Sequence, residues 1–592
     1  MIATYAAVLA VCAASLALGQ AAIGLCGARR WSWLAPAVGL ALLAAVCWGT
    51  VRLPGHGVVS AIAVLALVIA AVAYLRGRVE GGGEALRAGW PVALVALLAT
   101  SLPFIAEGHF GILGTSFNPD MSQHLLAAYR LAHGGGSQLL HQGYPLGPHS
   151  IVVALDRGLG IGLVQGFSGL TVAVAILAPL TALAAFASLR PLPRTAAALV
   201  VGLAYVVASY FAQGAFKETM QALFLLAFVL SLREGARSWR ELPLRFVPAA
   251  LLAVGAVYVY SFPGLTWLAG TAVLWALAEY ALGREESPLA LRPALLALLV
   301  LFVGVAPEIG RMVDFHSFET FDPNGPGLGN LFGQISPFEA LGIWPSGDFR
   351  LAPGAGAVPA AGYYLGAAFA LALLVWGAIR CWRRRELALL SGLAAAALAY
   401  AAARLGGTPY TAAKAIEIAS PLVALTILLP LLGGSVFLIP RYRGKGTPLD
   451  GPVATLFLLA AGACSLLALA NAPVGPTSYS PALTGLRPLV AADSTLVLAS
   501  PTLLSEQHGT PYIAWELRGG RVCIAAAGEV KDLDPAIRFV VTRGAAARPP
   551  FPGLRVRRVA PPYVLWEATG PVHGHSPCPL IAVRQARQGP AR

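Results

Sequence analysis

The chain has 592 residues, of which 57% are hydrophobic and only 11% are charged. Because soluble globular proteins carry about 25% charged residues, this composition excludes a soluble enzyme. The formal net charge is +14, from 41 Lys and Arg residues against 27 Asp and Glu residues. Most of the basic residues lie in short loops between apolar runs, where they orient membrane helices, so the charge gives no reason to expect a nucleic-acid partner.

Long apolar runs follow one another along most of the chain. Runs of about 18 to 25 residues can cross a hydrocarbon core about 30 Å thick, so we expect a polytopic membrane protein in contact with the lipid bilayer. The first charged residue is Arg29, so no basic segment precedes the first run, and a retained helix is favoured over a cleaved signal. About fourteen spans are predicted, beginning near residues 2, 32, 57, 89, 166, 195, 216, 246, 264, 290, 360, 387, 412 and 452.

Alternate loops between the predicted spans differ in charge. One set of short loops carries 20 Lys and Arg residues, whereas the opposite set carries 8 spread over longer loops. Since positive residues favour the cytoplasmic side, we expect a bacterial plasma-membrane protein with both termini outside. The predicted regions are N-terminal membrane helices at 1–106, a first external loop at 107–165, a membrane bundle at 166–471 with a second external loop at 307–359, and an extracytoplasmic domain at 472–592.

The tail after residue 472 changes in composition. Segments 494–500, 521–526, 537–542 and 554–559 are rich in strand-forming residues, and residues 511–517 have a helical composition. The predicted fold is therefore mainly α, a polytopic helix bundle with a C-terminal α/β domain. The tail has two cysteines, for which a disulfide and two buried thiols are alternatives: Cys523 and Cys578.

The first external loop contains a polar helix. Asn118 and Pro119 predict a helix start, with Asn as the cap, and residues 121–132 continue as a helix too polar to span. Asp120 then lies in its first turn, one turn before His124 on the same face. Asp120 either stabilises its own helix or serves as a reactive carboxylate. Five of the ten histidines lie in this loop: His109, His124, His133, His141 and His149.

These features resemble the GT-C superfamily of membrane glycosyltransferases. The resemblance is carried by Asp120, which opens a juxtamembrane helix, and by Tyr144-Pro145-x-Gly147-x-His149, a turn that leads into a second amphipathic helix. Members of that family use a sugar linked to a polyprenyl phosphate or diphosphate on the outer side of the membrane, with a carboxylate as general base. The resemblance implies Asp120 as this base and a glycan, lipid or protein as acceptor.

The chain departs from the family pattern in two ways. The Asp-containing loop follows about the fourth predicted span instead of the first, and no paired Asp-x-Asp is present. The early helices are therefore interpreted as an added module. The resemblance implies no definite cofactor, and it leaves open whether the site binds a divalent metal ion.

Lysine is rare in this chain, and two of its four lysines open apolar spans. Lys217 is followed by Glu218, and Lys414 is followed by Glu417. Each lysine could be an interfacial anchor or part of an intrahelical ion pair. However, the chain prefers Arg to Lys by 37 to 4, and a lysine ammonium is a compact point charge suited to phosphate. We therefore expect both lysines to contact a lipid-linked phosphate, with further candidates at external helix ends: Arg404 and Arg311.

Other polar segments have less specific patterns. Tyr258 to Gly264 predict a tight external turn, and Asp156 and Arg157 either pair with each other or face the active cavity. The second external loop has acids and a histidine that could supply a second carboxylate or a metal ligand, although ordinary solvated loop residues are the favoured interpretation: Glu308, Asp314, His316, Glu319 and Asp322.

The preferred hypothesis is a glycosyltransferase with Asp120 as base. Its candidate substrate-binding residues are Lys217, Glu218, Lys414, Glu417, His124, Tyr144, His149 and Arg404. One alternative is a transporter or flippase of a lipid-linked or anionic substrate. Such proteins usually have charged residues near the midplane of the membrane and an internal repeat. An envelope glycan polymerase or ligase, which uses the same donor chemistry, is another alternative.

Overall fold

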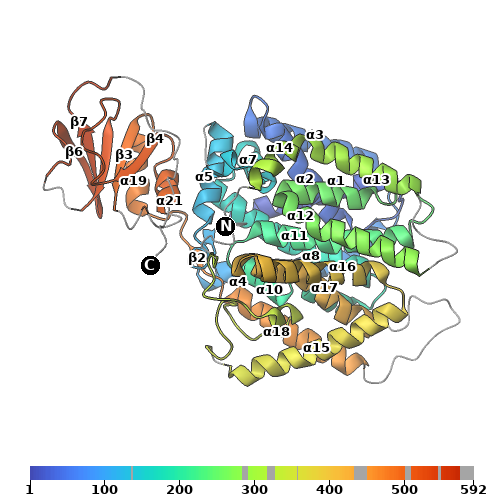
Figure 1. The fold of residues 1–592 in the computed structure, drawn as a ribbon. Helices are drawn as coiled ribbons and strands as arrows, with labels where there is room; N and C mark the ends of the chain where they lie inside the picture. The colour runs from blue at the N-terminus through green and yellow to red at the C-terminus, as the bar shows by residue number, and fades with distance from the viewer. Residues whose placement is uncertain are drawn as a thin grey trace. The chain divides into compact units, whose positions relative to one another are not determined.

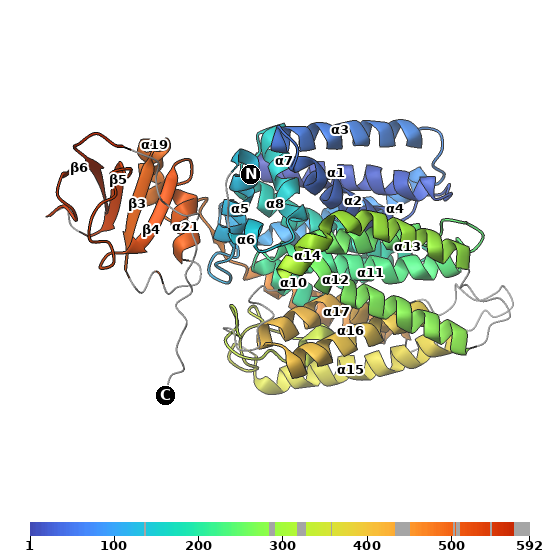
Figure 2. The same ribbon diagram turned by 45° about the horizontal axis from the view of Figure 1, so that its top comes forward.

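The computed structural model describes residues 1–134, 138–282, 291–316, 327–356, 358–432, 450–500, 504, 509–544 and 548–573 (Figures 1 and 2). The chain divides into two compact units. The membrane unit comprises Met1–Asn118 and Gln142–Val474, and the C-terminal unit comprises Pro119–His141 and the chain from Gly475 onward. The helix that follows Asp120 therefore belongs to the C-terminal unit.

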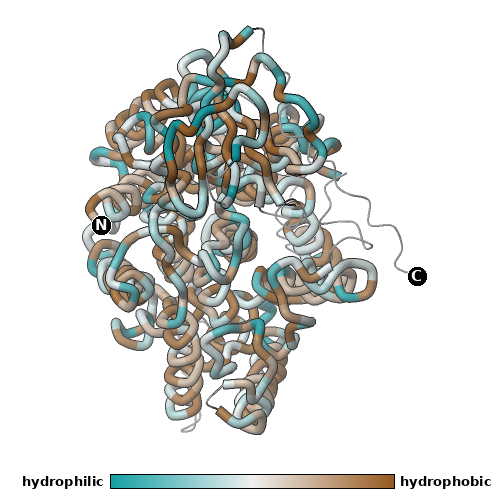
Figure 3. Tube along the Cα trace, turned by 90° about the vertical axis from the view of Figure 1, so that its left-hand side faces the viewer, coloured by the Kyte–Doolittle hydropathy of each residue, from teal (hydrophilic) through white to brown (hydrophobic). Residues whose placement is uncertain are grey.

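Helices make up nearly all of the membrane unit. Figure 3 shows these helices mainly in the brown and pale colours of hydrophobic and neutral residues. In chain order the elements are α1 (Ile2–Leu25), α2 (Ala35–Val51), α3 (His56–Leu75), α4 (Gly82–Ala106), β1 (Ile112–Leu113), α7 (Gly147–Leu159), α8 (Leu163–Phe186), α9 (Pro191–Gly202), α10 (Tyr205–Ala212), α11 (Phe216–Ala236), α12 (Val247–Ala281), α13 (Leu291–Val305), η1 (Ala306–Glu308), α14 (Ile309–Phe315), η3 (Pro337–Leu341), α15 (Ala360–Arg383), α16 (Leu387–Gly406), α17 (Pro409–Leu432) and α18 (Asp450–Ala470).

Helix α12 turns back on itself at Ser261, whose φ of 60° and ψ of −156° are not helical. A straight helix of its 35 residues would be about 52 Å long. Yet the ring centroids of Phe246 and Trp275, near opposite ends of α12, lie 5.6 Å apart. The two arms of α12 therefore run antiparallel, and the predicted turn at Tyr258–Gly264 is confirmed.

The described residues contain eleven helices long and apolar enough to cross a membrane, or twelve if the bent pair α9 and α10 forms one span. The 17-residue α2 is a shorter apolar helix. When α2 is included and α12 is treated as two arms, these helices account for the fourteen apolar segments predicted from the sequence. One boundary differs from the prediction, because Pro307 to Phe315 continue the span that begins at Leu291 instead of opening the second external loop.

The interior of the bundle is formed by α8, α11 and α17, which are buried along most of their length, whereas α3 and α13 are largely exposed. Some glycines are required because the backbones of two helices come into close contact there. A Cβ atom on Gly39 would lie 1.7 Å from the carbonyl oxygen of Ser15, and one on Gly19 would lie 1.9 Å from that of Ala35. Small residues allow α1 and α2 to cross at this distance, as is common between membrane helices.

The C-terminal unit is built on a five-stranded sheet with strand order β4-β3-β5-β7-β6. Strands β4, β3 and β5 are parallel, whereas β7 is antiparallel to both β5 and β6. Buried apolar residues from the sheet form one cluster with α19 and α21 and a second cluster that includes Trp566. The elements are α5 (Met121–His133), α6 (Gln138–His141), β2 (Val474–Gly475), α19 (Pro481–Val490), β3 (Ser494–Ala499), α21 (Gly509–Glu516), β4 (Arg521–Ala526), β5 (Phe539–Arg543), β6 (Leu554–Ala560) and β7 (Tyr563–Ala568).

The predicted strands and the predicted helix of the tail are confirmed, and the tail has the expected α/β character. The sequence interpretation missed α19 and β7. Ser480 followed by Pro481 is a helix-start signal for α19, and Tyr563 to Ala568 form an aromatic and β-branched run typical of a strand. Cys523 is disulfide-bonded, which agrees with one of the two alternatives predicted for it. Cys578 lies outside the described residues.

Candidate active site

The N-terminal parts of α11 and α17 carry the two lysines singled out in the sequence. Lys414 Nζ lies 3.0 Å from Glu218 Oε1, so an ion pair joins the start of α17 to the start of α11. Lys217 and Glu218 are buried, with 8% and 5% of their surface exposed. The tertiary structure therefore brings together three predicted substrate-binding residues that are up to 197 positions apart in the sequence.

Both lysine ammonium groups lie over tyrosine rings. Lys217 Nζ is 3.9 Å from the ring centroid of Tyr144 and 5.7 Å from that of Tyr260. Lys414 Nζ is 4.1 Å from the ring centroid of Tyr410. An ammonium group over an aromatic face is stabilised by about 0.5 to 2 kcal/mol. We call this set the Lys–Tyr cluster: Tyr144, Lys217, Glu218, Tyr260, Tyr410 and Lys414.

A second polar layer lies one helical turn further along α11 and α17. Gln221 follows Glu218 by three positions and Glu417 follows Lys414 by three, and both are fully buried. Among the described residues, the Gln221 Oε1 atom, both Glu417 carboxylate oxygens and the Tyr210 hydroxyl have no hydrogen-bond partner. Leaving such a group unsatisfied costs about 1 to 3 kcal/mol. This layer can therefore accept hydrogen bonds from water or from the hydroxyl groups of a ligand.

The Tyr144 to His149 turn packs against several parts of the membrane unit. Gly147 allows close approach, because a Cβ atom there would lie 2.6 Å from the carbonyl oxygen of Tyr258. His149 is fully buried, with its ring centroid 5.5 Å from that of Phe167 and 5.6 Å from that of Phe216. The turn thus contributes the ring of Tyr144 to the cluster, whereas His149 packs behind it among aromatic rings.

A group of Arg, Glu and Trp residues holds the backbone of this turn. Arg311 donates a hydrogen bond of 2.8 Å to the carbonyl oxygen of Tyr144 and lies 3.6 Å from Glu308. Glu308 is also paired with Arg52 at 3.0 Å and accepts a 2.7 Å hydrogen bond from Trp48. Glu308, expected to be a solvated loop acid, is instead buried between two guanidinium groups.

Asp120 lies in the C-terminal unit. Helix α5 begins at Met121, so Asp120 is its N-cap, two positions later than the cap predicted at Asn118, and its side chain makes no capping hydrogen bond. The reason is that Pro119 and Asp120 form a turn before the helix instead of its first residues. Burial, followed by the charges of Asp120 and Glu516, raises the pKa of the Tyr479 phenol, so Asp120 lies within electrostatic range of a residue from the tail.

Several other predicted residues do not lie in the Lys–Tyr cluster. His124 is buried within the C-terminal unit, and Arg404 is exposed in the last turn of α16. Asp156 and Arg157 pair with each other at 3.5 Å, one of the two alternatives predicted. In the described part of the chain, no three His, Cys, Asp or Glu residues are grouped so that they could hold a metal ion. Glu319 and Asp322 lie outside the described residues.

Of the three tyrosines that lie against the lysines, the sequence predicted Tyr144 as a site residue but not Tyr260 or Tyr410. Tyr260 and Tyr410 are separated by about 150 positions, so no local spacing connects them. A partial signal was present, because Tyr260 lies within the predicted turn at Tyr258–Gly264 and Tyr410 lies one turn before Lys414. The resulting arrangement places two cations on aromatic faces near buried oxygen acceptors, which suits an anionic group that also carries hydroxyls.

No family model matches the sequence, and no curated protein matches it. Among solved structures, the fold is similar to arabinofuranosyltransferase AftD from mycobacteria, with a TM-score of 0.52, 16% identity, and coverage of 82% of this chain and 40% of AftD. An AftD mutant gives a TM-score of 0.50, also at 16% identity, with coverage of 82% of this chain and 42% of the mutant. ArnT from Cupriavidus metallidurans bound to undecaprenyl phosphate gives a TM-score of 0.49 at 12% identity, with coverage of 82% of this chain and 99% of ArnT.

This chain therefore spans about two-fifths of the AftD structures that it matches. The likeness covers most of this chain and concerns the fold. Together with the apolar helices, it confirms a multi-pass membrane protein. The chain has the fold of the GT-C membrane glycosyltransferases.

Proposed function

We propose that the protein is a membrane glycosyltransferase that moves a sugar from a polyprenyl-phosphate donor to an acceptor on the outer side of a plasma membrane. The acceptor is a cell-envelope glycan, a lipid or a protein. The observation that carries the proposal is the convergence of Lys217 and Lys414 in the Lys–Tyr cluster, within a GT-C fold. Two buried ammonium groups suit a phosphate that gains charge as it leaves.

In the proposed reaction, Asp120 removes the proton of the acceptor hydroxyl. The hydroxyl oxygen bonds to the anomeric carbon as the bond from that carbon to the phosphate oxygen breaks, and the polyprenyl phosphate departs with the electron pair. Lys217 and Lys414 stabilise the charge on the departing phosphate, while Glu218 holds Lys414 in place. The buried oxygens of Gln221 and Glu417 are available for hydroxyl groups of the donor sugar.

The decisive experiment measures transfer of radiolabelled sugar from a panel of polyprenyl-phosphate sugars in membranes, for the wild type and for Asp120→Asn. General-base catalysis typically contributes a factor of about 10² to 10⁴, so we expect Asp120→Asn to lower transfer by at least about 100-fold. Asp493→Asn is the matched control, because Asp493 belongs to the same unit and pairs at its surface with Arg538 at 3.7 Å.

Each outcome has a distinct meaning. Loss of transfer in Asp120→Asn, with normal transfer in Asp493→Asn, supports the enzyme and its base together. Normal transfer in Asp120→Asn excludes Asp120 as the base but leaves the glycosyltransferase in place. A folded wild type that transfers no sugar from any donor contradicts the proposal and favours a transporter or flippase.

A further inference from the structure

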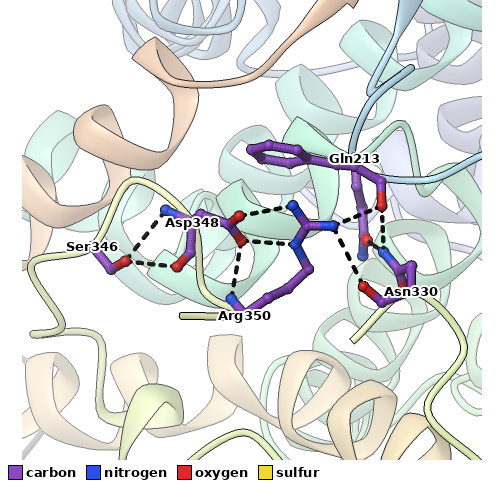
Figure 4. A network of polar contacts seen from close by, with 6 residues as sticks. Gln213, Asn330, Ser346, Asp348 and Arg350 are labelled. Atoms are coloured by element: carbon purple, nitrogen blue, oxygen red, sulfur yellow. Dashed lines mark hydrogen bonds and ion pairs between the residues drawn. The ribbon is translucent and has the colours of Figure 1, made fainter. Parts of the chain in front are cut away.

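The second external loop contacts three chain segments that each precede a proposed site residue. Within this loop, residues 327–350 contain Asn330, Asp348 and Arg350. Figure 4 shows these three side chains in one polar network with Gln213, which caps the C-terminal end of α10. All residues of this network lie in the membrane unit.

The first contact fixes the segment that leads to Asp120. Arg350 donates a hydrogen bond of 3.0 Å from its guanidinium group to the carbonyl oxygen of Phe117. The same guanidinium is held by Asp348 through two hydrogen bonds of 2.9 and 2.7 Å. It also lies over two aromatic rings, 4.3 Å from the centroid of Phe117 and 4.6 Å from that of Phe332. A planar guanidinium held by a carboxylate and two rings has little freedom to move.

The second contact fixes the segment that leads to Lys217. The side-chain amide of Asn330 donates both to the Phe117 carbonyl, at 2.9 Å, and to the side-chain oxygen of Gln213. Gly114 reinforces this contact, because a Cβ atom there would lie 2.2 Å from the carbonyl carbon of Gln213. The segment before Asp120 and the end of α10 are thereby joined through one amide group.

The third contact fixes the segment that leads to Lys414. The backbone N–H of Tyr410 donates a 3.2 Å hydrogen bond to the carbonyl oxygen of Gly327. Gly329 packs against the same tyrosine, so that a Cβ atom there would lie 2.7 Å from the ring. With its φ of 55°, Gly329 also has a conformation that other residues rarely adopt.

The spacing along the chain is similar at all three contacts. Asp120 follows Phe117 by three positions, Lys217 follows Gln213 by four, and Lys414 follows Tyr410 by four. We propose that Arg350, held by Asp348 and bonded to Phe117 and Asn330, is a positioning residue that anchors this loop. The anchored loop in turn holds the segments before Lys217 and Lys414, so that both lysines can bind one donor phosphate. This inference rests on the proposed function. A misplacement of about 1 Å can cost a factor of about 100 in rate, so the positions of these segments matter for catalysis.

The test compares Arg350→Gln with Arg233→Gln in the full-length protein. Arg233 is a matched control because it is equally buried and also binds a carboxylate through two nitrogens, with contacts of 2.9 and 3.3 Å to Glu386. We expect Arg350→Gln to lower kcat per folded molecule by about tenfold or more with a smaller change in donor KM, and Arg350→Lys to restore part of the rate. Arg233→Gln should lower thermal stability to a similar extent but leave kcat within about twofold.

Hydrogen exchange provides a readout that needs no activity. In Arg350→Gln, the amides of residues 112–118 and 213–217 should exchange faster than in the wild type, whereas Arg233→Gln should leave them unchanged. Unchanged exchange, or an equal loss of kcat in both variants, overturns the positioning role even if the wild type transfers sugar. Faster exchange combined with a wild type that transfers no sugar overturns the proposed function and leaves the anchoring contacts supported.

Discussion

Each end of α11 contributes one partner to an ion pair, Glu218 at the N-terminal end and Arg233 at the C-terminal end, yet the two pairs are built differently. At the C-terminal end, Glu386 accepts hydrogen bonds from Arg233 through both of its oxygens and a further one of 2.9 Å from Arg237. At the N-terminal end, Lys414 makes one 3.0 Å contact with Glu218 and lies on the ring of Tyr410.

This difference separates a structural pair from a candidate binding site. The carboxylate of Glu386 is engaged by two guanidinium groups and has little capacity for a ligand. The Lys–Tyr cluster instead lies beside buried oxygens of Tyr210, Gln221 and Glu417 that have no hydrogen-bond partner among the described residues. Buried polar groups are normally satisfied, so those that are not indicate a place where another molecule completes the contacts.

The strongest test of this comparison is Lys414→Met. Removing one partner of a buried ion pair costs about 3 to 5 kcal/mol, and here Glu218 would lose its ion-pair partner and keep only the nearby charge of Lys217. Loss of one group that stabilises the leaving phosphate should lower transfer by about 100-fold or more. Thermal denaturation in detergent and radiolabelled transfer measure the two effects.

A double variant separates these effects. Lys414→Met with Glu218→Gln removes both charges, so most of the stability should return while transfer stays low. Wild-type transfer by the double variant would mean that Lys414 has only a structural role, like Arg233.

A smaller effect is expected at the other end of α11. Arg233→Gln leaves Arg237 as a partner of Glu386, so we expect a loss of about 1 to 3 kcal/mol of stability and almost no change in transfer per folded molecule. The denaturation midpoint and the transfer rate per folded molecule are measured for Arg233→Gln and for the wild type. A loss of transfer larger than the loss of folded protein would show that this end of α11 also serves the reaction.

The smallest effect concerns pH. Burial raises the pKa of Glu386, but the hydrogen bond and charge of Arg233, with the charge of Arg237, outweigh it, so the net pKa lies below its usual range. In the unfolded chain the carboxyl has its usual pKa of about 4.3, so the unfolded state takes up a proton first as the pH falls. The stabilisation is therefore present at neutral pH and declines below about pH 5.

The variant Glu386→Gln lacks this titration. Between pH 7 and pH 4 its denaturation midpoint should fall less than that of the wild type. If the denaturation midpoints of the two proteins fall equally between pH 7 and pH 4, Glu386 contributes no net electrostatic stabilisation.

Much of the fold follows from local patterns in the sequence. The two arms of α12 were predicted as separate spans because Tyr258 to Gly264 interrupt the apolar run with a Pro and a Gly. The start of α5 was placed two residues too early, because Asn118-Pro119 has the chemistry of a helix start but Pro119 and Asp120 form a turn instead. Helix boundaries depend on such local competition and are less certain than the helices themselves.

A membrane bundle with an α/β tail, and two rare lysines near helix starts, could be predicted from the sequence, because apolar length, strand composition and residue choice are local properties. The tertiary structure was needed to show that Lys217 and Lys414 meet three tyrosines, that Glu308 is buried between arginines, and that residues 327–350 contact three segments that precede proposed site residues. These contacts join residues far apart in the chain. They form when buried helices pack together and desolvated charges must find partners, which no spacing within one segment specifies.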